Sequence, residues 1–179
     1  MKIIKGKDFR LRNTCVTIGK FDGVHLGHRQ ILKEMKKIKD KEGLTTVVLT
    51  FDFSYFNNSS EERLNSYDEK IRILEGLDVD IMIDYPFDEV TKDLSAEDFI
   101  RIVLLKRLGA KAVIVGDNFR FGKGACGDIS TLESYGKMYG FSTIVVPCVC
   151  YEGENVSSTR IRDELSRGNI EQAEYMLGE

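Results

Sequence analysis

The stretch "GKFDGVHLGH", residues 19–28, contains both histidines of a chain of 179 residues. The apolar, β-branched run "VTI" comes just before it, and a helical pattern over residues 26–41 begins within it. The three glycines of the stretch allow tight turns and a close approach of the backbone to another group. We therefore predict that this loop joins a strand to a helix, with His25 and His28 at the positive end of the helix dipole.

Several runs like the one before this loop occur along the chain, and helix-length segments separate most of them. Strands that are apolar throughout and alternate with helices indicate a parallel sheet covered on both faces. The sequence thus predicts an α/β fold, a Rossmann-like doubly wound parallel sheet of about five strands with helices on both faces, formed by a single domain over residues 1–179. The expected strands contain "CVTIG", "TTVVLTF", "VDIMIDY", "AKAVIVG" and "FSTIVVPCVC".

Two of the expected helices carry clear signals at their ends. The first has one apolar stripe, and Gly43 follows it as a stop. The residues "SAED" at 95–98 form a capping box, which predicts a helix that runs to about Leu108.

The composition sets limits on the partners of the chain. With 42% hydrophobic and 31% charged residues and a net charge of −3, it lacks the basic excess of a nucleic-acid-binding protein. It also lacks an apolar run long enough to cross a membrane, so we expect a cytoplasmic protein without a membrane partner. The cysteines show no CxxC pair, which predicts buried free thiols rather than disulfides or zinc ligands. They are Cys15, Cys126, Cys148 and Cys150.

The two histidines allow three interpretations. Imidazoles and free backbone N–H groups at a helix start can bind a phosphate and stabilise charge that develops on a phosphoryl group. A zinc site would need further ligands, but the chain has no other histidine and its cysteines are distant in sequence. The histidines could also simply cap the helix.

A second stretch, "VSSTRIRDEL" at residues 156–165, favours the phosphate interpretation. Its hydroxyl side chains lie just before an expected helix whose first turn carries two arginines. Cations are unfavourable in the first turn of a helix unless an anion offsets the dipole. We therefore expect this stretch to bind an anion, although it could also be a simple N-cap with surface arginines.

The pair "HLGH" and "SSTRIR" resembles the two motifs of the HxGH nucleotidylyltransferase superfamily. Within it, the chain is similar to the FMN adenylyltransferase (FAD synthetase) module of the bacterial riboflavin kinase/FAD synthetase family. The resemblance covers nearly the whole chain, because "DEKIRILEGLDVD", "LSAEDFI", "VGDNFRFGKGACGD" and "VSSTRIRDELSRGNIEQAEYMLG" also follow the family pattern in order.

The resemblance implies that FMN and ATP react to give FAD and pyrophosphate, with the FMN phosphate attacking the α-phosphorus in line. Such an enzyme needs no nucleophile of its own, and its task is to position two anions and stabilise charge. Magnesium is expected to enter with ATP, held mainly by phosphate oxygens and water, so no protein ligand is predicted. The oligomeric state is left open.

The resemblance also assigns roles to residues of this chain. The motif histidines His25 and His28 would contact the triphosphate, and Ser158 and Arg162 would bind its β- and γ-phosphates. Further residues fall into three groups: those that shape the adenylate pocket, those that complete the second motif, and those on the flavin side, where Asn118 lies beside the reacting phosphate. In that order they are Gly19, Phe21 and Gly27; Thr159 and Arg160; and Asn118, Phe119, Arg120 and Phe121. One or both of the two phenylalanines are expected to lie in the core.

The chain departs from the family pattern in two places. After the second expected strand, Phe51 and Asp52 remain, but two prolines and a histidine of the family are replaced, so the role of the 51–60 loop in holding FMN is open. Family members commonly continue into a riboflavin kinase domain, and we expect none within residues 1–179. Two alternatives remain: a related transferase with another phosphate acceptor, and a flavin- or nucleotide-binding protein without turnover.

Overall fold

The computed structural model describes residues 1–53 and 63–178, so residues 54–60 of the 51–60 loop lie outside the described part. Its centre is a six-stranded sheet with the order β1-β4-β3-β2-β5-β6, in which every neighbouring pair is parallel. A short antiparallel hairpin, β7–β8, stands apart from it. The strands are β1 (Lys2–Lys5), β2 (Thr14–Ile18), β3 (Thr45–Asp52), β4 (Ile81–Pro86), β5 (Ala110–Gly116), β6 (Ser142–Val146), β7 (Cys150–Tyr151) and β8 (Glu154–Asn155).

The expected α/β fold with a parallel sheet is confirmed, and all five expected strands are present. The sixth, β1, is an edge strand with two lysines in four residues and little burial, so it lacks the apolar run by which the others are found. The last expected strand was predicted too long. It ends at Val146, just before Pro147, and the residues beyond form the hairpin instead.

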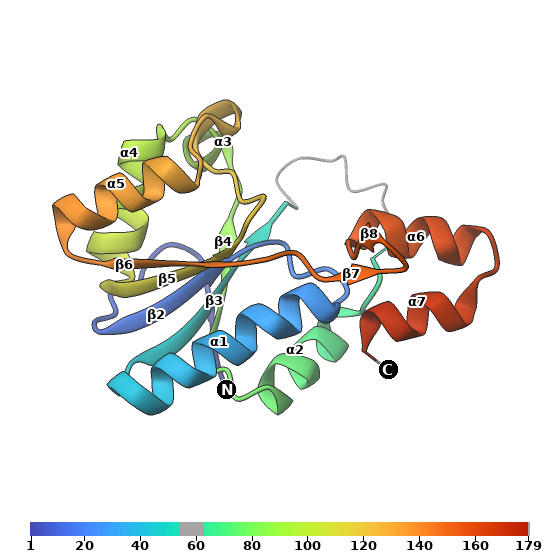
Figure 1. Ribbon diagram of the computed structural model, residues 1–179. Helices are drawn as coiled ribbons and strands as arrows, with labels where there is room; N and C mark the ends of the chain where they lie inside the picture. The colour runs from blue at the N-terminus through green and yellow to red at the C-terminus, as the bar shows by residue number, and fades with distance from the viewer. Residues whose placement is uncertain (54–62, 179) are drawn as a thin grey trace.

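Helices cover both faces of the sheet, as predicted (Figure 1). Helices α1 and α2 lie on one face, and α3, α4, the π-helix η1 and α5 lie on the other (Figure 1). The pair α6 and α7 lies beyond the end of the sheet (Figure 1). The helical segments are α1 (Leu26–Glu42), α2 (Tyr67–Gly76), α3 (Glu89–Lys92), α4 (Ala96–Asp98), η1 (Phe99–Arg107), the 3₁₀ turn η2 (Lys123–Ala125), α5 (Ile129–Tyr139), α6 (Ser158–Ser166) and α7 (Ile170–Leu177).

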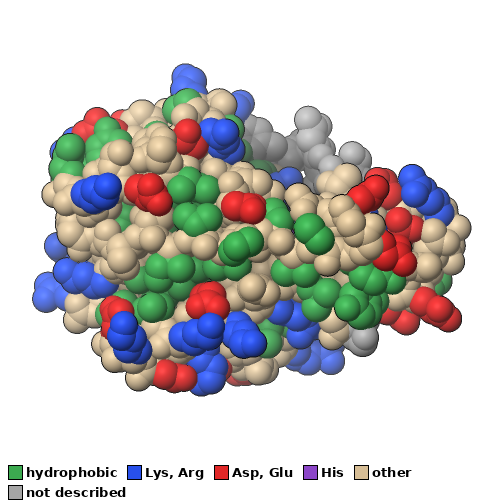
Figure 2. Space-filling model, viewed as in Figure 1, with side chains coloured by type: hydrophobic (Ala, Val, Ile, Leu, Met, Phe, Trp, Pro, Cys, Tyr) green, Lys and Arg blue, Asp and Glu red, His purple; other side chains and the backbone are tan. Residues whose placement is uncertain are grey.

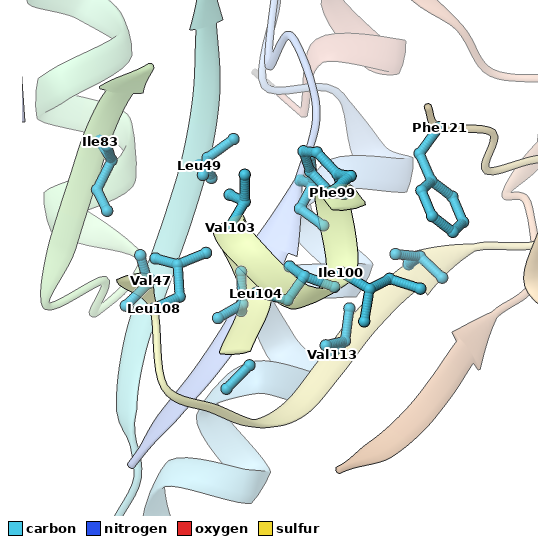
Figure 3. Packing of buried hydrophobic residues seen from close by; sticks show 14 of the residues in the cluster. Val47, Leu49, Ile83, Phe99, Ile100, Val103, Leu104, Leu108, Val113 and Phe121 are labelled. Carbon is cyan, nitrogen blue, oxygen red and sulfur yellow. The ribbon is translucent and has the colours of Figure 1, made fainter. Parts of the chain in front are cut away.

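Strand alternation divides the core into two clusters. Along β3, Val47 and Leu49 face the η1 side, whereas Val48 faces α1 and α2. On the η1 side, Val103 lies beside Leu49 of β3, and Ile100 lies near Val113 of β5 (Figure 3). Both faces of the central strands are thus buried, which explains why their sequences are apolar throughout.

The helix ends follow the expected signals. Gly43 adopts a left-handed conformation with φ of 66°, and its N–H donates to Lys39 at 2.8 Å, so it ends α1 as predicted. Ser95 accepts from the N–H of Asp98 at 3.0 Å, which confirms the predicted start of the 95–108 helix. Most of that helix is wound as a π-helix, a detail that the apolar pattern does not signal.

The α6–α7 pair has a small core of its own. Five buried side chains form it, and Leu64, from the segment before α2, packs against them. The pair therefore packs against loops at the carboxyl edge of the sheet, where ligands bind in open α/β folds. The five are Val156, Ile161, Ala173, Met176 and Leu177.

The described cysteines are all free thiols, as predicted, but only Cys15 is buried. Cys126 is exposed because it lies on the glycine-rich turn after β5. Cys150 is exposed because it lies on the hairpin, which was predicted as the end of the last strand. Acidic and basic side chains are mixed on the face seen in Figure 2, with hydrophobic side chains between them. Within the described residues, no helix is both long and apolar enough to cross a membrane.

Candidate active site

The loop from Gly19 to His28 leaves the end of β2 and enters α1. The N–H of Gly19 donates to Leu49 at 3.1 Å, so the loop starts in register with the sheet. Gly23 has φ of 59°, and a Cβ there would lie 2.8 Å from the side chain of Leu64. Only glycine fits this position without strain, because both its backbone conformation and the space around it exclude a side chain.

Phe21 and the two histidines form a stack at the start of α1. The rings of His25 and His28 lie 3.8 Å apart between centroids, and Phe21 stacks on His28 at 4.6 Å. Phe21 has φ of 48°, which is rare for a bulky residue, and its ring is fully buried. A Cβ on Gly27 would come within 3.1 Å of the His25 ring, so this glycine leaves room for the stack.

Hydrogen bonds fix a different tautomer for each histidine. His25 is the N-cap of α1, and its Nδ1 accepts from the N–H of His28 at 3.4 Å. The Nδ1 of His28 lies 3.2 Å from the carbonyl oxygen of Gly23, which can only accept, so this nitrogen carries the proton. In their neutral forms, His25 therefore presents an Nε2–H donor, whereas His28 presents an Nε2 lone pair.

Both histidines are neutral at pH 7 in the ligand-free protein. Burial lowers the pKa of His25 to about 4, although the carboxylate of Asp22 opposes this shift. Burial and the neighbouring His25 together lower the pKa of His28 to about 3, and Lys70 acts in the same direction. A bound polyanion would raise both values, because an opposite charge favours the protonated form.

The start of α6 lies against the same loop, so the structure brings the two sequence motifs together. Ser157 is the N-cap and accepts from the N–H of Arg160 at 3.2 Å. The helix begins at Ser158, whereas the sequence predicted that Ser158 and Thr159 would still precede it. The hydroxyl of Ser158 donates to the backbone oxygen of Asp22 at 2.6 Å. The guanidinium of Arg162 forms an ion pair with the Asp22 carboxylate.

Arg160 is directed away from this point, toward the β7–β8 hairpin. Its guanidinium donates to the backbone oxygens of Tyr151 and Glu154, each at 2.8 Å, and lies over the Tyr151 ring. Thr159, the other predicted residue of the motif, is exposed. Of the two arginines in this turn, Arg162 is thus the one held beside the histidine loop.

A second feature adjoins the end of β2 on the opposite face of the sheet. It is a cavity of about 280 Å³ with five phenylalanines in its wall. Phe119 and Phe121 stack at 5.6 Å between centroids, and Phe51 contacts Phe87 edge-on at 5.4 Å. Its lining residues are Ile18, Phe51, Phe87, Thr91, Lys92, Phe99, Phe119, Arg120, Phe121, Gly122, Gly124 and Ala125.

The predicted flavin-side residues separate into two groups. Phe51, Phe119, Arg120 and Phe121 line the cavity, and Phe121 is also part of the core, as expected for one of the two phenylalanines. Asn118 is exposed on the turn before them.

Asp52 does not line the cavity. It follows Phe51 in β3, so strand alternation directs its side chain to the other face, where its charge acts on Tyr67.

Sequence reasoning missed two contributions to this region. Phe87 lies two residues after the predicted strand 79–85 and directly after the observed β4, so its place at the sheet edge could have been found from the strand pattern. Asp22 lies inside the histidine stretch but carried no predicted role, and only the folded chain brings Arg162 to it. In the parts of the chain that the structure describes, no group of three or more His, Cys, Asp or Glu side chains could hold a metal ion.

Comparison with known proteins gives a consistent result. A family model described as FAD synthetase matches residues 7–160. A bifunctional riboflavin kinase/FMN adenylyltransferase from Buchnera aphidicola (Schizaphis graminum) is 38% identical over 99% of this chain and 60% of its own length. The protein of the same description from Escherichia coli K12 is 35% identical over 99% of this chain and 59% of its own length. The chain thus spans about 60% of the length of these relatives.

A solved structure shares the fold. It is described as the crystal structure of a macrolide-efflux protein from Streptococcus pneumoniae, and it matches with a TM-score of 0.86 and 26% identity. The match covers 99% of this chain and 60% of that one.

Proposed function

The chain belongs to the FAD synthetase family, and we propose that it is an FMN adenylyltransferase, which joins the AMP part of ATP to the phosphate of FMN. The observation that carries this proposal is the meeting of the two motifs: the histidine stack at the start of α1 lies against the start of α6, beside an aromatic cavity. The two helix starts suit a polyphosphate, and the aromatic cavity suits a flat ring system.

We assign the triphosphate to the space between the starts of α1 and α6. Free N–H groups and the positive ends of two helix dipoles favour negative charge there. His25 and His28 would contact the phosphates, and Ser158 and Arg162 would bind the outer two. Gly19, Phe21 and Gly27 would shape the adenylate side, since they set the path of the loop.

The tautomers give the two histidines different tasks. Neutral His25 can donate its Nε2–H to a phosphate oxygen at once, because its Nδ1 serves as the helix cap. His28 has its Nδ1–H directed to Gly23, and phosphate oxygens are acceptors, so its Nε2 must first take up a proton. A bound triphosphate raises the pKa of His28 and thus favours that uptake. Protonated His28 then stabilises charge on the phosphoryl group during transfer.

The aromatic cavity would take the flavin ring. Its stacked phenylalanines offer flat apolar walls, and Arg120 at its edge is held 3.3 Å from Asp128. Asn118, on the same turn, would lie beside the reacting phosphate.

The proposed reaction is a direct displacement. An oxygen of the FMN phosphate forms a bond to the α-phosphorus of ATP, and the bond from that phosphorus to the bridging oxygen of the β-phosphate breaks. FAD and pyrophosphate result, with no covalent intermediate on the protein. The side chains act by orienting both phosphates and by stabilising the added negative charge.

We propose that magnesium enters with ATP, held mainly by phosphate oxygens and water. When bound, it would neutralise part of the triphosphate charge. We also propose that residues 1–179 form one synthetase domain, and free thiols and a triphosphate substrate favour the cytoplasm as its location.

The decisive experiment incubates the purified chain with FMN, ATP and magnesium and separates the products by chromatography. We expect FAD and pyrophosphate in equal amounts. Riboflavin in place of FMN is the matched control, and it should yield neither FMN nor FAD. Consumption of ATP with another phosphate acceptor but not with FMN would identify a different transferase. Binding of FMN and ATP without product would contradict the proposed enzyme.

A further inference from the structure

Asp22 connects the two motifs. One carboxylate oxygen pairs with the guanidinium of Arg162, and the other accepts from the backbone N–H of Leu64 at 3.0 Å. Its own backbone oxygen accepts from the hydroxyl of Ser158 at 2.6 Å. A single residue of the α1 loop thus holds the first turn of α6 and the segment that precedes α2.

The surroundings of Asp22 are partly shielded from water. Its side chain is 16% exposed and that of Arg162 is 26% exposed. Buried or half-buried ion pairs with good hydrogen bonds fix geometry more firmly than exposed pairs do. The pair therefore sets the direction of the guanidinium plane, which as a rigid fork must face the phosphates correctly to bind them.

Charge argues against direct contact between Asp22 and the triphosphate. A carboxylate repels phosphate oxygens, so a binding role would have to act through a cation. Its charge pairs with Arg162 and opposes the lowering by burial of the pKa of His25 and of Lys70. Asp22 thus places a negative charge beside basic side chains where the two motifs meet.

We propose that Asp22 is a positioning residue that orients Arg162 toward the triphosphate of ATP. This inference rests on the proposed function, because it concerns the same substrate site. A purely structural alternative exists, since Asp22 also binds Leu64. The two can be separated with Asp22→Asn, which keeps an oxygen for the Leu64 N–H but removes the charge that pairs with Arg162.

The test is a double-mutant cycle with Asp22→Asn and Arg162→Ala, followed through the KM for ATP and for FMN. We expect Asp22→Asn to raise the KM for ATP about tenfold, in the range of couplings between contacting residues, with the KM for FMN changed less than about twofold. In the Arg162→Ala background, the same change should have no further effect on the KM for ATP. Equal effects in both backgrounds would overturn the inference, as would equal changes in both KM values.

Asp163→Asn is the matched control, because Asp163 lies on α6 beside Arg162 but is exposed. It should leave both KM values unchanged. If Asp22→Asn does not fold, as judged by its thermal transition, Asp22→Glu takes its place in the cycle, since it keeps the charge but shifts it along the side chain. Absence of FAD formation by the wild type would overturn the proposed function. An active wild type with independent effects would overturn this inference alone.

Discussion

The two motifs at the starts of α1 and α6 and the aromatic cavity that Phe119 lines adjoin at the end of β2 but are built differently. The motifs contribute helix ends, two stacked imidazoles and an ion pair, so each of their groups has a fixed direction. The cavity contributes the rings of five phenylalanines, whose effect depends on area and shape. This contrast predicts that changes in the two motifs affect turnover and the use of ATP, whereas changes in the cavity affect the affinity for FMN.

The largest effect is expected for His28→Ala. Removing one donor to a developing negative charge lowers turnover by about 10² to 10³. The KM for FMN should change much less, because His28 lies outside the lining of the aromatic cavity. Steady-state kinetics with each substrate varied in turn would measure both quantities. Unchanged turnover would show that the histidine stack only caps α1.

Arg162→Lys should have a smaller effect and raise the KM for ATP about tenfold. Lysine keeps the charge but loses the planar fork of the guanidinium. The affinity for FMN, measured by calorimetric titration, should stay nearly constant. The matched change Arg160→Lys alters the arginine that holds the hairpin and should leave the KM for ATP closer to that of the wild type. Weaker FMN binding with intact ATP binding would reverse the two assigned subsites.

On the cavity side, Phe119→Ala should weaken FMN binding about tenfold, since loss of an aromatic contact costs on the order of 1 kcal/mol. The affinity for ATP should not change. Tyr139→Ala is the control, because Tyr139 stacks on Tyr135 outside the cavity lining and is 38% exposed. Fluorescence quenching of the flavin would report the binding. An equal loss for both variants would place the flavin elsewhere.

The smallest effect concerns the stability of the protein at different pH values. The pKa values of His25 and His28 in the folded protein lie below the ordinary value of 6.5, so the unfolded chain binds more protons as the pH falls below it. Stability is therefore full above about pH 6.5 and decreases toward acid pH. The Tm of the wild type should drop between pH 7 and pH 5, and that of His28→Gln should drop less. Identical drops would contradict the lowered pKa of His28.

The positions of the two motifs could be predicted from the sequence, because each depends on residues that are close together in the chain. The end of β2, the glycines and the start of α1 follow each other directly, so the histidines could be placed at a helix N-terminus from residue types alone. The second motif could be placed in the same way, since Ser157 caps its own helix. The aromatic pair after β5 was identified only through the resemblance to the family pattern.

The rest depended on contacts between distant segments. Nothing near Arg160 indicates that it binds the hairpin, and nothing near Asp22 indicates that it receives Arg162. Strand β1 escaped detection because it pairs only at the sheet edge and so needs few apolar residues. Burial of Cys150 was overestimated because the sequence of its short hairpin has the apolar pattern of a buried strand.

The attachment of α7 has a consequence for how activity is lost. The Nε–H of Arg29, one residue beyond the histidine stack, donates to the backbone oxygen of Leu177 at 3.0 Å and to that of Val24 at 3.1 Å. Because α6 and α7 have a separate small core, we expect them to unfold locally, as one cooperative unit, while the sheet remains folded. Hydrogen exchange in α6 and α7 should accordingly be faster than in β2 and β5. Mild denaturant would then abolish catalysis well before the circular dichroism of the sheet changes.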